Sequence, residues 1–245
     1  MCCIDGGGTL GLWAMGAYRQ LASFDRKLNN VIQNTAFQFD HRKVRLFVIR
    51  SQLEQSGTEY FAIAGDSIAE ALSRKSACGK PLFNAGIGGA TVADIEIDVL
   101  PLMRKQPPAG LLIAIGINDS KHSSAKLPAE RLADFERAYQ SMLTAARALT
   151  PRVAVATIGP VEKGKELGDA TFDMKLIRQF NEAIRRIAAA MSVPVTELSG
   201  LADAQGFAHE GSTIDGVHLT SDAYAGWWAA MERGWSAIVK DCRSS

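Results

Sequence analysis

Residues 60–67 read Tyr-Phe-Ala-Ile-Ala-Gly-Asp-Ser, and the fold that we expect for the chain is built around them. The apolar run Tyr60–Ala64 has the length and composition of a buried strand. Gly65-Asp66-Ser67 follows it, and a helix-forming stretch begins at Ile68. A serine at such a turn is exposed and lies in the positive field of the helix N-terminus. Alone, these three residues are weak evidence for chemistry, because a strand-to-helix turn also favours them for structural reasons.

Apolar runs of strand length alternate with helical patterns along the rest of the chain. The strand-length runs are Tyr60–Ala64, Leu82–Ala85, Leu111–Ile115, Val153–Ile158 and Val193–Leu198. One set of apolar residues at steps of three and four is Leu132, Phe135, Tyr139, Met142, Ala146 and Leu149. A second set is Phe172, Leu176, Phe180, Ile184, Ile187 and Met191. This alternation predicts an α/β fold of three layers, a parallel sheet with helices on both faces.

A last helix is expected after Thr220, because aromatic and apolar residues again recur at helical spacing. Its inward-facing residues are Tyr224, Trp227, Met231 and Trp235. We interpret these aromatic side chains as core rather than as a cofactor site.

Polar residues of unusual type follow the predicted strands. Ser67 follows the first strand, Asn84–Gly89 the second and Gly116–Asp119 the third, while Asp215–His218 lies just ahead of the last helix. In open α/β sheets, ligand sites lie outside the carboxyl ends of the strands. The four segments are therefore expected to converge on one crevice.

A serine hydroxyl is a weak nucleophile near neutral pH and needs a base within hydrogen-bond reach. His218 can serve as that base, because Asp215 lies three residues earlier and can orient its ring. His122 is the alternative base, since it lies close after Asn118. His209 has an acid, Glu210, as its direct neighbour in the sequence. Because adjacent side chains point apart, Glu210 cannot easily orient the His209 ring. Asp215 could equally be a turn or capping residue beside an ordinary surface histidine.

Acyl transfer also needs hydrogen-bond donors for a developing oxyanion. The candidates are the backbone N–H of Gly89, the side-chain amide of Asn118 and the backbone N–H of Ser67. The structural alternatives are a tight glycine turn with Thr91 capping the next helix, and an Asx turn at Asn118. Each alternative is reasonable singly, but together they would require coincidences at one edge of the sheet.

The four segments together resemble the blocks of the SGNH hydrolases, also called the GDSL esterase/lipase superfamily, in the family's order over about residues 58–240. Within it, the chain resembles the acetylhydrolase and lysophospholipase-like branches. The resemblance implies Ser67 as nucleophile, His218 as base and Asp215 as its orienter. It also implies an oxyanion hole of Ser67, Gly89 and Asn118.

For the fold, the resemblance implies a flavodoxin-like parallel sheet of five strands in the order 2-1-3-4-5. It implies no metal or other cofactor, and a small-molecule, glycan or lipid ester as substrate. The chain departs from many relatives at Ala90, where they have a polar or acidic side chain, so the pocket beside the oxyanion hole is expected to differ.

We therefore expect a serine esterase that cleaves carboxylic esters through an acyl-enzyme. No long apolar lid is evident, which favours short, acetyl-type acyl groups. The loops Asp119–Pro128 and Gly159–Thr171 are expected to line the crevice. An acyltransferase with the same site, or a non-catalytic binding module, are the alternatives.

Residues 1–57 have no counterpart in the family's minimal domain and are expected to form an N-terminal extension to a hydrolase domain at 58–245. Ile4–Thr9 is rich in glycine and resembles patatin-like lipases or sugar kinases, but no G-x-S-x-G turn follows. Leu10–Tyr18 is apolar but too short to span a bilayer, so an amphipathic helix is favoured over a truncated signal or anchor. Val44–Arg50 could form an extra edge strand beside Tyr60–Ala64.

The amino-acid composition limits the kinds of binding partner that we expect. Lys and Arg number 27 against 26 Asp and Glu in 245 residues, and no basic run is present, so nucleic acid is not an expected partner. The four cysteines lack metal-site spacing and are expected to be reduced thiols. A cytoplasmic chain is favoured over a periplasmic or secreted one, and nothing in the sequence indicates an oligomeric state.

Overall fold

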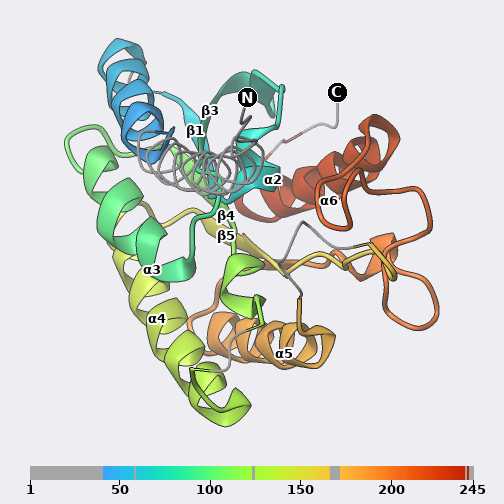
Figure 1. Ribbon diagram of the computed structural model, residues 1–245. Helices are drawn as coiled ribbons and strands as arrows, with labels where there is room; N and C mark the ends of the chain where they lie inside the picture. The colour runs from blue at the N-terminus through green and yellow to red at the C-terminus, as the bar shows by residue number, and fades with distance from the viewer. Residues whose placement is uncertain (1–40, 58, 123–124, 166–171, 241, 243–245) are drawn as a thin grey trace, which may run out of the picture. The chain divides into compact units, whose positions relative to one another are not determined.

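A computed structural model of the chain describes residues 41–57, 59–122, 125–165, 172–240 and 242 (Figure 1). The chain divides into two compact units, Met1–Arg45 and Leu46–Ser245, and the second holds the sheet. The glycine-rich stretch 4–9 and the helix expected around residues 10–28 lie outside the described residues. None of the described helices has both the length and the apolar content needed to cross a membrane.

The sheet has six strands in the order β2-β3-β1-β4-β5-β6. They are β1 Phe61–Gly65, β2 Ser76–Ala77, β3 Lys80–Gly86, β4 Gly110–Ala114, β5 Val153–Ala156 and β6 Val195–Thr196. All neighbours pair in parallel except β2 with β3. The predicted α/β fold and the order of its five strands are confirmed. The short antiparallel β2 adds a sixth strand at the edge, which the sequence did not predict because two residues are too few to show a strand period.

The helices that follow the strands begin with α2 Ser67–Glu70 and α3 Val92–Asp94, which continues into a π-helix Ile95–Val99 and a 3₁₀ turn Leu100–Met103. The long helices are α4 Pro128–Leu149, α5 Met174–Ala190 and α6 Ser221–Ile238. Short 3₁₀ turns occupy Asn118–Ser120 and Ser199–Leu201. The helices expected from the three apolar sets are thus present, and Thr220 is the N-cap of the last one.

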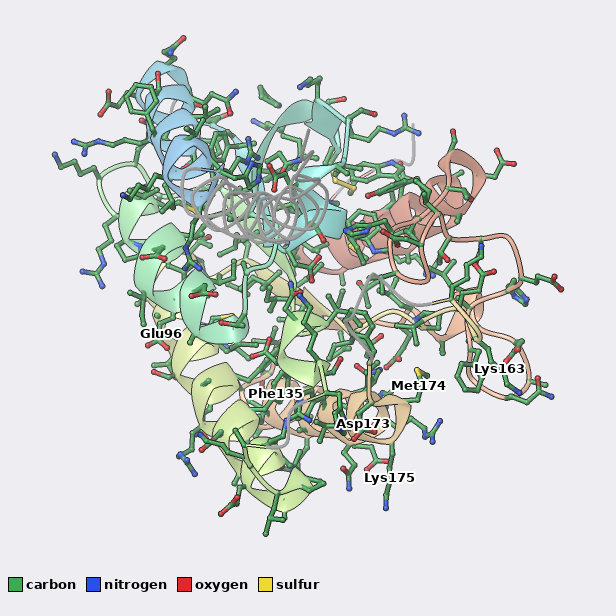
Figure 2. All side chains as sticks on the ribbon, in the orientation of Figure 1. Glu96, Phe135, Lys163, Asp173, Met174 and Lys175 are labelled. Atoms are coloured by element: carbon green, nitrogen blue, oxygen red, sulfur yellow. A yellow bond between two sulfur atoms is a disulfide. The ribbon has the colours of Figure 1, made fainter. Side chains whose placement is uncertain are left out.

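Alternate residues of β1 face two separate cores. Ala62 and Ala64 lie in the core beneath α3, α4 and α5, whereas Phe61 and Ile63 lie in the core beneath α6. Figure 1 shows α4 and α5 on one side of the labelled strands and α6 on the other. Phe135 of α4, labelled in Figure 2, stacks on Phe180 of α5 with ring centroids 3.8 Å apart. The sheet is therefore covered on both faces, which leaves its carboxyl edge for a site.

Residues 44–50 are helical, so the edge strand suggested for them is wrong. They belong to a helix over residues 41–55, in which Ile49 and Leu53 are buried at a spacing of four while Phe47 is 71% exposed. Burial at steps of four, rather than at every second residue, is the pattern of a helix with one apolar stripe.

Two of the cysteines form a disulfide, so the expectation of reduced thiols is wrong for this pair. Cys78, in the turn between β2 and β3, bonds to Cys242 beyond α6, with Cα atoms 4.5 Å apart. The partners are separated by 164 residues, so no local spacing indicates the bond. Their proximity follows from the fold, since both lie beside the core beneath α6.

Candidate active site

Three neighbouring strands end at the same level of the sheet. Gly65, the last residue of β1, pairs with Gly86 of β3 and with Ala114 of β4. Their following turns therefore emerge side by side at the carboxyl edge. This register brings together segments that are up to about 50 residues apart in the sequence.

Ser67 is the first residue of α2, where the chain leaves β1. Asp66 caps this helix, because its buried carboxylate accepts the backbone N–H of Ile68 at 2.9 Å. The Tyr224 hydroxyl of α6 donates to the carbonyl of Ile68 at 2.9 Å and ties the same turn to α6. The backbone N–H of a first helical residue has no acceptor within its helix, so the N–H of Ser67 can serve a ligand.

His218 and Asp215 complete a chain of hydrogen bonds that begins at Ser67. The Nε2 atom of His218 lies 2.9 Å from the Ser67 Oγ, and its Nδ1 lies 2.7 Å from an Asp215 carboxylate oxygen. The other oxygen of Asp215 accepts the backbone N–H of His218 at 2.9 Å. His122, the alternative base, is exposed, and so is His209. The geometry thus favours His218 as the partner of Ser67.

Opposing effects act on the pKa of Asp215. Burial alone would raise it, but the hydrogen bonds from the His218 ring and from the N–H groups of His218 and Val217 outweigh burial. The net result is a pKa of Asp215 below its ordinary value. The carboxylate therefore stays ionised near neutral pH, as the orientation of a histidine requires.

The glycine turn after β3 lies next to Asn118. Gly89 has a φ of 76°, a left-handed conformation that only glycine adopts at low cost, in a turn closed by the N–H of Ala90 on the Ile87 carbonyl. The Nδ2 atom of Asn118 donates to the Ala90 carbonyl at 2.9 Å, across 28 residues of sequence. This bond is not an Asx turn, and it leaves the amide a second hydrogen to offer. Thr91 is also the N-cap of α3, so that structural role coexists with the proximity of Gly89 and Asn118.

Two further carboxylates hold this turn: Asp119, which lies in one of the four predicted segments but had no role assigned to it, and Glu70, which the sequence did not indicate. Asp119 accepts the backbone N–H of Val92 at 3.2 Å, which anchors the start of α3 beside Asn118. Burial raises the pKa of Asp119 to about 7. Glu70 of α2 accepts the N–H of Gly88. Asp119 directly follows Asn118, and this adjacency was the only signal available; Glu70 gave none, because its partner is 18 residues away.

An apolar cavity of about 190 Å³ lies close to these residues. Ile68, which follows Ser67, and Val217, which precedes His218, both line it, together with Trp227 of α6. Among the described residues, no cluster of three or more His, Cys, Asp or Glu side chains could hold a metal ion.

Comparison with known proteins identifies a family. A model of the GDSL-like lipase/acylhydrolase family matches residues 51–225, more than half of the chain. None of the curated proteins compared with the chain matches it.

Solved structures match the fold over most of the chain. A protein from Streptococcus pneumonia has a TM-score of 0.67 at 21% identity and covers 83% of this chain and 96% of its own. A GDSL-like lipase from Bacteroides thetaiotaomicron has a TM-score of 0.62 at 18% identity, covering 79% and 98%. An acetylxylan esterase from Geobacillus stearothermophilus has a TM-score of 0.52 at 20% identity, covering 76% and 97%. At these identities the likeness shows the fold.

Proposed function

The chain belongs to the family of GDSL-like lipases and acylhydrolases and is a carboxylic ester hydrolase, and from this premise we propose that it cleaves short acyl esters through an acyl-enzyme on Ser67. His218 is the general base in this proposal and Asp215 orients it. The backbone N–H groups of Ser67 and Gly89 and the side-chain amide of Asn118 form the oxyanion hole.

One observation carries the proposal: Ser67, His218 and Asp215 form a single chain of hydrogen bonds. With Nδ1 bonded to the carboxylate at 2.7 Å, the ring proton lies on Nδ1 and the lone pair of Nε2 faces the Ser67 Oγ at 2.9 Å. This tautomer allows the serine to lose its proton as it attacks.

The reaction follows from these contacts. The Ser67 proton passes to Nε2 of His218 as Oγ bonds to the acyl carbon, and the carbonyl oxygen becomes an oxyanion. Collapse of this intermediate breaks the bond to the alcohol, which leaves with the proton from His218. Water then repeats the sequence on the acyl-enzyme, giving up its proton to His218 and releasing the carboxylic acid and a neutral Ser67.

Replacing the nucleophile tests the proposal. We expect Ser67→Ala to reduce the turnover of p-nitrophenyl acetate by at least about 1,000-fold, because no acyl-enzyme can form. The control is Ser236→Ala, which removes an exposed hydroxyl on α6. Circular dichroism of both variants checks the fold. Turnover by a folded Ser67→Ala protein at the rate of the control contradicts the proposal.

The preference for short acyl groups has two supports. The apolar cavity beside Ile68 and Val217 is small, and the structural relatives include an acetylxylan esterase. We expect kcat/KM for p-nitrophenyl esters to be highest at two to four acyl carbons. An optimum at twelve carbons or more contradicts the preference but leaves the mechanism intact.

The acyltransferase alternative shares the acyl-enzyme and differs only in what attacks it. Adding an acceptor alcohol to the assay distinguishes the two reactions. We expect water to remain the main acceptor, with free acid as the principal product. A new ester as principal product at a few millimolar alcohol identifies a transferase instead.

A further inference from the structure

A buried carboxylate outside the proposed triad faces the loop that leads to His218. Glu162 follows β5 and is only 5% exposed. One of its oxygens, Oε1, accepts the backbone N–H of Gly211 at 2.9 Å. The other, Oε2, accepts the backbone N–H of Thr213 at 3.0 Å and the Thr213 hydroxyl at 2.6 Å. All three donors belong to the segment that directly precedes Asp215.

Thr213 passes this contact on to the turn between Asp215 and His218. Its Oγ1 atom donates to Glu162 and accepts the backbone N–H of Gly216 at 2.9 Å. Because the hydroxyl has a single proton and gives it to the carboxylate, its lone pairs are directed to Gly216. Glu162 therefore sets the orientation of the Thr213 hydroxyl, which in turn binds the backbone between Asp215 and His218.

The backbone at residues 162–165 also contacts the turn between Asp215 and His218. The N–H of Glu162 donates to the Gly216 carbonyl at 2.8 Å. Gly216 has a φ of 101°, and a Cβ there would lie 2.7 Å from the Lys165 carbonyl oxygen. Only glycine fits this position, since any side chain would push the turn away from residues 162–165.

Lys165 supplies the countercharge for the buried carboxylate. Its Nζ lies 2.9 Å from Glu162 Oε1 and donates to the Thr213 carbonyl at 2.8 Å. The hydrogen bond from the Thr213 hydroxyl, with those from Gly211, Lys165 and the Thr213 N–H, lowers the pKa of Glu162 to about 2. The carboxylate is thus charged and fully bonded at any working pH.

Residues 161–165 and 207–213 lie side by side along this stretch. Ala208 forms a parallel bridge with Glu162, and its N–H donates to the Val161 carbonyl at 2.9 Å. Lys163, labelled in Figure 2, extends over the ring of Phe207 with Nζ 5.8 Å from its centroid. These contacts fix the base of the loop, and the Asp215–His218 turn is held by the Ile214 N–H on the His218 carbonyl as well as by Glu162 and Thr213.

We propose that Glu162 is a positioning residue which, through the Thr213 hydroxyl, holds the turn carrying Asp215 and His218 against Ser67. This inference rests on the roles proposed above for Asp215 and His218. A displacement of about 1 Å at such a distance from the chemistry can cost about 100-fold in rate. Glu162 touches neither Ser67 nor the substrate in this account and acts only through the loop.

The Thr213 hydroxyl is tested by two matched variants. Thr213→Val keeps the shape but leaves the Gly216 N–H without its acceptor, so we expect kcat for p-nitrophenyl acetate to fall about 10- to 100-fold. KM should change by less than about twofold, because substrate binding does not use this contact. Thr213→Ser restores the hydroxyl and should restore kcat to within about threefold. Equal activity of the Val and Ser variants overturns the proposal.

Glu162→Gln is tested in two backgrounds, with Glu197→Gln as a control that breaks a half-exposed ion pair with Arg185. In the wild-type background we expect a loss in kcat of about 10- to 100-fold for Glu162→Gln and less than twofold for the control. In a His218→Ala background, where the turn has no base to position against Ser67, Glu162→Gln should cost less than about threefold. Equal losses in both backgrounds, or no loss in either, overturn the positioning role.

The same cycle separates this inference from the function on which it rests. Full activity of His218→Ala alone contradicts the proposed triad itself. A large loss for His218→Ala combined with no loss for Glu162→Gln contradicts only the role of Glu162. If Glu162→Gln does not fold, the Thr213→Val and Thr213→Ser pair still decides the question.

Discussion

The two ring nitrogens of His218 form hydrogen bonds with different partners. Single substitutions at these partners are therefore expected to have large effects on activity. Nδ1 is 2.7 Å from Asp215 and Nε2 is 2.9 Å from Ser67. The carboxylate accepts a hydrogen bond from Nδ1–H, so Nε2 is the nitrogen able to receive a proton. In the proposed mechanism, activity therefore depends on the acceptor character of Asp215 as much as on its position.

Asp215→Asn tests this dependence. The amide is nearly isosteric, but its N–H₂ can face Nδ1 and favour the tautomer in which Nε2 carries the proton. We expect kcat for p-nitrophenyl acetate to fall by about 10,000-fold, while circular dichroism is unchanged. Glu210→Gln, which neutralises an exposed carboxylate on the same loop, should stay within about twofold. Similar losses for both variants contradict a specific role for Asp215.

The raised pKa of Asp119 predicts how the free energy of unfolding depends on pH. Burial raises its pKa to about 7 from 3.8, so between about pH 4 and 7 the folded protein binds more protons at this site than the unfolded chain does. The contribution of Asp119 to the free energy of unfolding therefore falls as pH rises through this window. Asp119→Asn removes the titration, so its stability relative to wild type should increase from pH 4 to pH 7.

Urea unfolding of both proteins across that range measures the effect. Burial also raises the pKa of Asp66, to about 6, but Asp66 titrates in both proteins, so the comparison reports on Asp119. A difference in unfolding free energy that is constant with pH contradicts a raised pKa at Asp119.

At the scale of elements, the contact between α4 and α5 rests on stacked aromatic rings. Phe135 is 3% exposed and lies parallel to Phe180, with an interplanar angle of 6°. We expect Phe135→Ala to lower the free energy of unfolding by about 3–5 kcal/mol, since it removes the ring and leaves a cavity. Leu127→Ala, at a side chain 68% exposed, should change it by less than about 0.5 kcal/mol. Comparable losses in urea unfolding contradict this account of the packing.

The long elements were predictable because they repeat one pattern many times. The apolar residues of α4 and α5 recur at helical spacing over many turns, and the buried strands β1, β4 and β5 are continuous apolar runs. The short elements were not. β2 has two residues, and the π-helix Ile95–Val99 differs from an α-helix only in its hydrogen-bond register. Residues 44–50 were misassigned because a short apolar run fits a strand or a buried helix equally well.

The residues of the proposed site also fall into two groups, those that the sequence predicted and those that it did not. Most of its residues lie in short local patterns at the ends of strands and helices: Gly65-Asp66-Ser67, Gly89, Asn118 and Asp215-x-x-His218. Their convergence therefore followed from the expected topology. Glu70 and Glu162 hold backbone groups that are 18 and about 50 residues away, and a lone glutamate in a loop or helix has no local pattern. Such residues are found only when the fold shows what they face.

At the scale of the whole molecule, the disulfide closes a very long loop. Cys78 and Cys242 are separated by 164 residues, so the bond restricts most of the unfolded chain. We expect reduction, or Cys78→Ser, to lower the free energy of unfolding by about 2–5 kcal/mol in urea. Reductant should have no further effect on Cys78→Ser, which serves as its control.

Equal unfolding midpoints of the wild-type protein with and without reductant contradict a stabilising disulfide.

Labelling by a fluorophosphonate tests whether Ser67 is a nucleophile activated by His218. The probe forms a covalent bond with an activated serine, and peptide mass spectrometry locates the adduct. We expect one adduct, on Ser67, that forms in the wild-type protein and forms far more slowly in His218→Ala. An unlabelled wild-type protein, an adduct on another serine, or equal labelling of His218→Ala would contradict it.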